Sequence, residues 1–171
     1  KELRDSRSKG LTVVCVDDLE IATAIENTIR GDEFVGPIFN KEADNSTVFN
    51  ELQIENIPFG GMLLKAMLDK VFVDHRLKAI QLYDLKVVWD NQGFYYEYYL
   101  KKLAYIQALI YYGALESRTA NLGFDYTDYK IEFPIFVVAD SSNFYAPLQY
   151  KLTVDDLDGA LQGFTTETGR R

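Results

Sequence analysis

The sequence predicts an α+β protein in which a central mixed β-sheet is flanked by helices. Apolar residues recur at helical spacing before residue 31, alternate as in strands from 47 to 88, and return to helical spacing after residue 94. Neighbouring strands joined by short turns favour an antiparallel meander, and the later helix leads to a further strand. The 171 residues, of which 47% are hydrophobic, are enough for one globular core. We therefore expect a single domain over residues 1–171.

The first predicted element is a helix. Asp17 or Asp18 can cap it, and it runs to about Arg30, where Gly31 ends it. A polar loop over 40–47 follows. The apolar stripe of this helix consists of Leu19, Ala22, Ala24, Ile25 and Ile29.

The next three elements are predicted strands. Residues 47–56 alternate apolar and polar side chains, and a turn at 58–61 follows them. The second strand covers 62–74, and the third, AIQLYDLKVV, covers 79–88. The single histidine, His75, falls in the short loop between them, where we expect it to be exposed.

A long helix is predicted from about Phe94 to Leu115, with Gln107 inside its apolar stripe. Tyr96 and Leu103 belong to the same predicted stripe. The elements expected after it are a loop over 116–128, a strand over 129–140 kinked at Pro134, a second strand over 146–153 and a short helix over 154–163.

Charge and composition narrow the classes of function. A net charge of −8 argues against a protein that coats nucleic acid non-specifically. The segment from Lys65 to Lys102 nevertheless holds seven Lys and Arg against five Asp and Glu. A locally positive site on an acidic protein is compatible with a polyanionic substrate in a cleft.

Location is predicted from three absences in the sequence. It has no apolar run near 18 residues and no visible signal peptide, and its one cysteine, Cys15, has no internal partner for a disulfide. We expect a cytoplasmic protein without a membrane span. Because the chain begins at Lys1, it is also expected to be a fragment or a trimmed chain.

Asp84 and Lys86 raise the question of function. Two residues apart in a strand, they share a face with Ile80, Leu82 and Val88. Charged groups within an apolar strand are costly unless they are paired or used. Taken alone, the pair is most simply interpreted as a salt bridge at the strand end.

Asp69 lies one strand and one loop before Asp84, so a hairpin can bring both carboxylates to one point. Converging carboxylates favour a divalent cation between them, and hard oxygen ligands select Mg²⁺ or Mn²⁺ over zinc. Glu51, on the preceding strand, is a candidate third acidic ligand. Lys86 beside the metal could orient a water nucleophile or stabilise charge on a phosphoryl oxygen.

This set, Glu51, Asp69 and Asp84-x-Lys86, resembles the PD-(D/E)xK nuclease superfamily. Gln107-Ala108-Leu109-Ile110-Tyr111 is similar to the Q-x-x-x-Y signature of the RecB-like and lambda-exonuclease-like branch. GMLLKAMLD, residues 61–69, resembles the K-x-x-x-D stretch of phage exonuclease VIII-like proteins, with Lys65 at the basic position. The resemblance covers about residues 17 to 163.

The resemblance implies a restriction-endonuclease-like core and a role for each matched residue. Asp69, Asp84 and the backbone carbonyl of Leu85 would hold Mg²⁺ or Mn²⁺, with Glu51 assisting and Lys86 positioning the attacking water. Gln107 would support catalysis, and Lys65 and Tyr111 would contact the substrate. The chain departs from the family pattern at Val87, where a threonine is usual, and at Leu68, where the family name has proline. It also lacks a recognisable upstream Gly-x-x-x-His or acidic motif. Either the chain is a fragment that lacks this upstream helix, or the protein does not have it.

The implied function is a metal-dependent deoxyribonuclease, most simply an exonuclease of phage or bacterial recombination or repair. Linear duplex DNA would be its substrate, and a single-strand annealing protein and further copies of the chain its partners. The alternative is a nuclease fold whose catalysis has decayed and which binds DNA or a protein partner. The presence of Asp69, Asp84 and Lys86 together favours the enzyme.

Overall fold

The computed structural model describes residues 15–40, 45–59 and 61–162. Six strands form one mixed sheet in the order β1-β2-β3-β5-β6, with the short β4 paired to β3 beside β5. β1, β2 and β3 form the predicted antiparallel meander, β3 and β5 run parallel, and β6 returns antiparallel to β5. The strands are β1 (Ser46–Phe59), β2 (Met62–Asp74), β3 (Ala79–Val88), β4 (Lys130–Ile131), β5 (Ile135–Asp140) and β6 (Leu148–Lys151).

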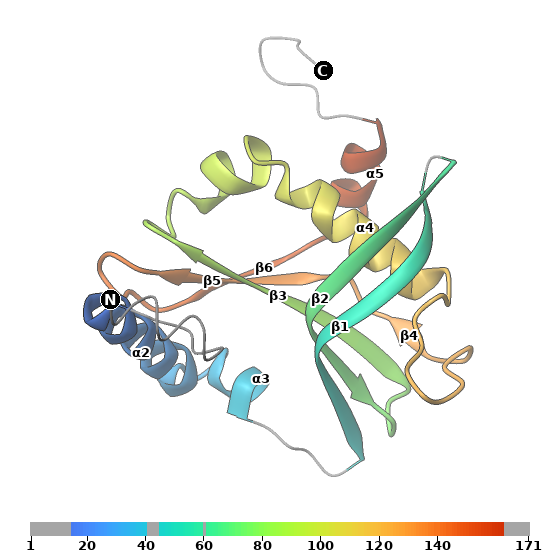
Figure 1. Ribbon diagram of the computed structural model, residues 1–171, viewed down its shortest axis with the longest axis horizontal. Helices are drawn as coiled ribbons and strands as arrows, with labels where there is room; N and C mark the ends of the chain where they lie inside the picture. Colours follow the sequence, from blue (N-terminus) through green and yellow to red (C-terminus); the bar gives the residue numbers. More distant parts are fainter. Residues whose placement is uncertain (1–14, 41–44, 60, 163–171) are drawn as a thin grey trace, which may run out of the picture.

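Helices cover both faces of this sheet (Figure 1). One face carries α2 (Val16–Gly31) and α3 (Gly36–Asn40); the other carries α4 (Ala104–Glu116) and α5 (Val154–Gln162), preceded by a π-helical turn, η1 (Tyr95–Leu100). Among the described residues, no helix combines the length and the apolar character needed to cross a membrane. The predicted α+β class with a helix-flanked mixed sheet is confirmed. Residues 41–44 of the predicted loop at 40–47, and residue 163, lie outside the described residues, whereas Ser46 and Thr47 belong to β1 and not to the loop.

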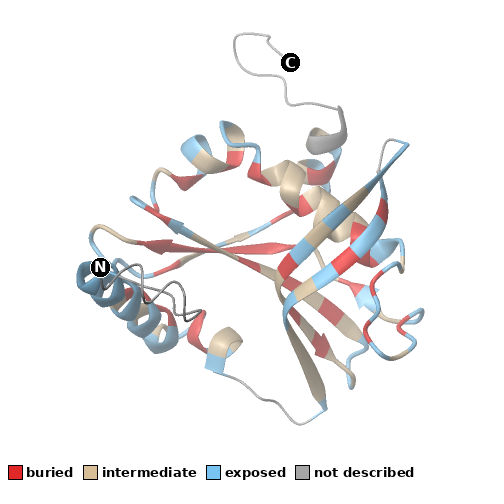
Figure 2. Ribbon diagram, in the orientation of Figure 1, coloured by how far each residue is buried: buried red, intermediate tan, exposed pale blue. Residues whose placement is uncertain are grey.

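β5 contributes to two of the three core clusters, one on each face of the sheet. All six of its residues are buried, as the red course of β5 in Figure 2 shows. Phe136 and Val138 pack in the cluster with η1, α4 and α5, whereas Val137 and Ala139 pack under α2 and α3. A strand apolar on both faces is what a central position with helices on either side requires.

The buried face of β1 and β2 changes part-way along the two strands. The paired residues Phe49 and Val71 belong to the same core as the paired residues Leu52 and Leu68. In a regular strand, residues three apart point to opposite faces. Glu51, between the two pairs, has a positive φ of 54°. The predicted strict alternation is therefore wrong here, and the irregularity falls opposite Asp69.

The predicted helix over 94–115 is interrupted. The backbone N–H of Lys101 donates to the carbonyl of Tyr96 at 3.2 Å, five residues back, and Leu103 then adopts a left-handed conformation (φ 59°, ψ 35°). A π turn rotates side chains differently from an α turn, so the predicted stripe does not continue through it. Two of its members, Tyr96 and Leu103, are 62% and 46% exposed.

His75 is not the exposed loop residue that the sequence predicts. Its Nε2 lies 2.7 Å from the Thr47 hydroxyl and its Nδ1 lies 2.8 Å from the Tyr129 hydroxyl. The ring of Phe124 packs edge-on against it, with centroids 5.0 Å apart. Both partners with hydroxyl groups come from segments distant in sequence, so the loop residue is enclosed by tertiary contacts.

Candidate active site

The site is built where β2 and β3 separate. The two strands pair as far as Lys70 and Tyr83, and the ladder stops there. Beyond that point the Oδ2 atom of Asp69 accepts the backbone N–H of Leu85 at 3.1 Å. A strand residue directs its N–H and C=O to the same side, so the Leu85 carbonyl also faces the edge that β2 has left.

Asp84 and Lys86 stand on the β3 face that is covered by α4. Asp84 is 2% exposed, in line with the buried residues Leu82 and Val88 on either side of the pair. The Lys86 Nζ atom lies 2.5 Å from Asp84 Oδ2, and the lysine side chain keeps 22% of its surface exposed. The ammonium therefore connects a buried carboxylate with the open side of the sheet.

Helix α4 contributes Gln107 and Tyr111 from one of its faces. The Gln107 Oε1 atom accepts a hydrogen bond from Lys86 Nζ at 2.9 Å. Its Nε2 donates to the Tyr111 hydroxyl at 2.7 Å and, at 3.4 Å, to Asp84 Oδ1. The structure thus brings together the four predicted residues of the D-x-K and Q-x-x-x-Y patterns in one network. What they do chemically stays a prediction.

The charge on Asp84 is held in an unfavourable environment. Burial raises its pKa to about 6, the Lys86 ammonium opposes that rise, and the Asp69 charge adds to it. Asp84 Oδ2 is buried and its charged neighbour is the Lys86 ammonium at 2.5 Å, which lowers the pKa of Asp84 without offsetting the effect of burial. An added cation would lower the energy of the ionised form.

The oxygen atoms present fit a hard divalent cation. Asp84 offers the buried Oδ2, Asp69 a half-buried carboxylate, and Leu85 a main-chain carbonyl. Mg²⁺ is commonly bound by one or two carboxylates and completes its shell with water and substrate phosphates. Within the described ranges, no group of three or more His, Cys, Asp or Glu side chains is placed to hold a metal. The described residues therefore supply two carboxylates, those of Asp69 and Asp84, for a cation at this site.

Asp69 lines clefts on both sides of the sheet. A cleft of about 610 Å³ between β2 and α4 is shared by Asp69, Gln107 and Tyr111. On the α2 side, a cleft of about 410 Å³ is lined by Asp69 together with Glu51 and Leu85. Glu51 is exposed on this second side, while Lys86 and Gln107 meet on the first. The structure does not bring Glu51 into the network.

Lys65 lines the cleft of about 610 Å³ but is engaged elsewhere. Its ammonium lies 2.6 Å from Glu55 on the neighbouring strand, and its side chain is 76% exposed. Leu103, which lines the same cleft and is 46% exposed, was not predicted as a site residue, because a continuous helix places it within a buried stripe. The adjacent pair Lys101-Lys102 is the one sequence signal near that position.

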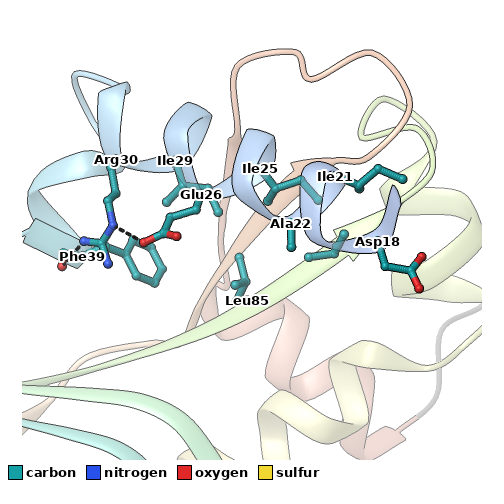
Figure 3. A pocket seen from close by; sticks show the side chains of 10 residues that line it. Asp18, Ile21, Ala22, Ile25, Glu26, Ile29, Arg30, Phe39 and Leu85 are labelled. Carbon is teal, nitrogen blue, oxygen red and sulfur yellow. Dashed lines mark hydrogen bonds and ion pairs between the residues drawn. The ribbon is translucent and has the colours of Figure 1, made fainter. Parts of the chain in front are cut away.

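A third cavity, of about 420 Å³, lies between α2 and β3 (Figure 3). Ile21, Ile25 and Ile29 line it from the helix and Leu85 from the strand, and the Glu26–Arg30 ion pair stands at its edge. Its walls are mainly apolar and hold none of the Asp84 network. It therefore belongs to the packing of α2 against the sheet.

No protein-family model matches the sequence, and a comparison with curated proteins gives no match. The fold is similar to the crystal structure of a protein from Eubacterium rectale that is provisionally named an exonuclease, with a TM-score of 0.54 and 16% sequence identity. The likeness is one of fold. It covers 92% of this chain and 54% of the other, so the chain spans about half the length of that protein.

Proposed function

We propose that the protein is a divalent-metal-dependent nuclease of the PD-(D/E)xK type that hydrolyses phosphodiester bonds in DNA. The observation that carries the proposal is the network in which the buried Asp84 carboxylate pairs with the partly exposed Lys86, and Gln107 contacts both residues and Tyr111. Burial raises the pKa of Asp84 to about 6, and a buried ionisable group with a shifted pKa is a frequent feature of functional sites. The fold shared with a provisionally named exonuclease supports the same class.

Each residue of the network has a role in this proposal. Asp69, Asp84 and the Leu85 carbonyl would hold Mg²⁺ or Mn²⁺. When bound, such an ion supplies Lewis acidity toward a phosphoryl oxygen and lowers the pKa of bound water. Lys86, held by Gln107 at 2.9 Å, orients the attacking water and stabilises charge developing on the phosphate.

Tyr111 acts through Gln107. Because its hydroxyl accepts from Gln107 Nε2 at 2.7 Å, the amide is oriented with its Oε1 toward Lys86. Reversing the amide would direct two donors at the ammonium. Tyr111 is therefore proposed as a positioning residue. Water would attack phosphorus in line with the P–O3′ bond; that bond breaks, the 3′ oxygen leaves and is protonated, and the product carries a 5′-phosphate.

The biological setting is proposed from the resemblance and from the neighbour's name. Linear duplex DNA would be digested from an end during phage or bacterial recombination or repair. A single-strand annealing protein and further copies of the chain would be its partners.

The direct test uses fluorescently labelled linear duplex DNA with Mg²⁺ or Mn²⁺. We expect cleavage that EDTA stops, and we expect Asp84→Asn to lose it, since a neutral amide binds a hard cation poorly. Calorimetric titration with Mn²⁺ should show binding to the wild type and loss of binding in Asp84→Asn. Asp128→Asn is the matched control, because Asp128 also pairs with a lysine, Lys78, but on the exposed surface.

A nuclease fold without catalysis, which binds DNA or a protein, is the second candidate. It is favoured by the absence of a three-acid group among the described residues and by the nearness of the Lys86 ammonium to Asp84 Oδ2. Wild-type protein that binds DNA but neither binds Mn²⁺ nor cleaves with either metal would establish this second function.

A further inference from the structure

We propose that the interrupted helix carries a separate binding site for single-stranded nucleic acid. The site, here called the tyrosine–lysine patch, consists of Tyr95, Tyr96, Lys101 and Lys102. The inference rests on the proposed function to the extent that the strand bound there leads to the Asp69 cleft. Its test is nevertheless a binding measurement that needs no cleavage.

Two adjacent aromatic side chains of the patch face solvent. Tyr95 is 49% exposed and Tyr96 is 62% exposed, whereas Phe94 and Tyr99 in the same segment are buried in the core. Tyr95 is also held flat against Tyr99, with ring centroids 5.3 Å apart and planes 16° apart. Exposed, pre-oriented rings are the surfaces on which unpaired bases stack.

Each of the two lysines lies over a tyrosine ring of the same segment, Lys101 over Tyr96 of the patch and Lys102 over the neighbouring Tyr98. The Lys101 ammonium lies 4.9 Å from the centroid of Tyr96, and that of Lys102 lies 3.8 Å from the centroid of Tyr98. The Lys101 ammonium also forms an ion pair with the Glu97 carboxylate, at 2.7 Å. Across the part of the chain that the structure describes, no carboxylate forms an ion pair with Lys102. A cation in this setting, on a chain of net charge −8, is available to a phosphate.

The patch is next in the chain to a residue of the cleft of about 610 Å³ that Asp69 and Gln107 line. Leu103 follows Lys102 directly and lines that cleft. The π turn and the left-handed Leu103 interrupt the helix here, so the lysines do not continue the face of α4. We expect a strand bound on the patch to pass Leu103 toward Asp69.

The chemistry favours a single strand as the occupant. Stacking on tyrosine requires a base whose face is free, and bases inside a duplex are already stacked on each other. Two lysines alone would attract either form through the phosphates. The exposed tyrosine rings therefore favour a single strand over duplex DNA.

The test is fluorescence anisotropy with a labelled oligothymidylate of about 12 nucleotides, within the usual site size for such surfaces. EDTA is present, so that neither metal nor cleavage contributes. We expect Tyr96→Ala to weaken binding about tenfold and Tyr96→Phe to retain it, since the ring is what stacks. Lys102→Gln should weaken binding and lower the salt dependence by about 0.7 on a log–log plot.

Glu97→Gln should strengthen oligonucleotide binding, whereas Tyr96→Ala and Lys102→Gln should weaken it. It removes a negative charge from the patch and releases Lys101 for a phosphate, so binding should become tighter. Phe34→Ala and Lys130→Gln are matched controls: Phe34 is 71% exposed and Lys130 has a 74% exposed side chain, and neither belongs to the patch. Circular dichroism checks that every variant is folded, and Lys102→Gln and Glu97→Gln test the patch if Tyr96→Ala is not.

The inference is overturned if the wild type does not bind the oligonucleotide, or if the patch variants bind as the wild type does. It is also overturned if Tyr96→Ala changes the sedimentation of the free protein and leaves binding intact, which would assign the patch to self-association. If the wild type cleaves DNA and the patch variants bind the oligonucleotide as the wild type does, the nuclease proposal stands and the patch proposal is wrong. If the patch variants lose binding and the wild type neither cleaves DNA nor binds Mn²⁺, the patch proposal stands and the nuclease proposal is wrong.

Discussion

The two ends of the β2–β3 pair differ in how their polar side chains are paired. At the turn between the strands, each ring nitrogen of His75 has a hydroxyl partner, one from Thr47 and one from Tyr129. At the other end the strands separate, and the buried Asp84 carboxylate is paired with the Lys86 ammonium. The first end is held by hydroxyl partners, and the second by a buried charge and its ion pair.

The difference shows where the fold holds unfavourable electrostatic energy. His75 has two hydroxyl partners, whereas burial raises the pKa of Asp84 to about 6 in spite of the Lys86 ammonium. A buried ionisable group with a shifted pKa is a frequent feature of functional sites. The His75 end is therefore expected to stabilise the fold, and the Asp84 end to act on a substrate.

The largest expected effect is on the rate of DNA cleavage, which should depend on Lys86 at one end and not on His75 at the other. Lys86→Ala should lower the rate of DNA cleavage by about 10²–10³, because a group that stabilises charge in the transition state is lost. His75→Gln should leave the rate unchanged. Both are measured as initial rates on labelled linear duplex with Mg²⁺. Equal losses in the two variants would mean that the rate reports the fold and not the site.

The second prediction concerns stability and pH at Asp84. Its pKa is raised from 3.8 to about 6 in the folded protein, so the stabilisation from protonation is present below pH about 4 and is lost as the pH rises through about 6. Asp84→Asn resembles the protonated form at every pH. In EDTA, denaturant unfolding should show similar stabilities at pH 4 and a variant more stable by up to about 3 kcal/mol at pH 7. A variant less stable than wild type at pH 7 would contradict this.

The third prediction is the counterpart at the other end. His75→Ala should lower the free energy of unfolding by about 2 kcal/mol, because two hydroxyl partners and an aromatic contact are lost together. Thermal and denaturant unfolding at pH 7 measure it. Destabilisation here, set against stabilisation by Asp84→Asn, is the result that supports the contrast between the two ends.

The smallest effect is expected at Tyr111. Tyr111→Phe removes the acceptor that orients Gln107, so cleavage should fall about 10-fold, mainly in kcat. Tyr112→Phe, one residue along the same helix, is the control and should keep its rate. If Tyr111→Phe changes the stability of the protein but not kcat, Tyr111 serves in packing and does not position Gln107.

Local patterns were sufficient to predict much of the fold and the position of the network. Asp84 and Lys86 share a face because strand side chains alternate, and Gln107 and Tyr111 share one because helix positions four apart do. The closing contact, Lys86 to Gln107 at 2.9 Å, joins the two patterns.

The remaining features depend on contacts between distant segments. The partners of His75 lie 28 and 54 residues away, so no window around the loop reveals its enclosure. The irregularity at Glu51 arises where two strands change their buried face together. The interruption before Ala104 follows from aromatic packing of η1 against the sheet, which overrides a helical pattern that is continuous in the sequence.

Trp89, the single tryptophan of the chain, lies just past the end of β3 and is 75% exposed. Its indole is already in water in the native protein, so its emission should change little when the chain unfolds. Circular dichroism is therefore the appropriate optical signal for the melting experiments. A shift of tryptophan emission to shorter wavelength would instead report that a ligand or another chain has covered this end of the sheet.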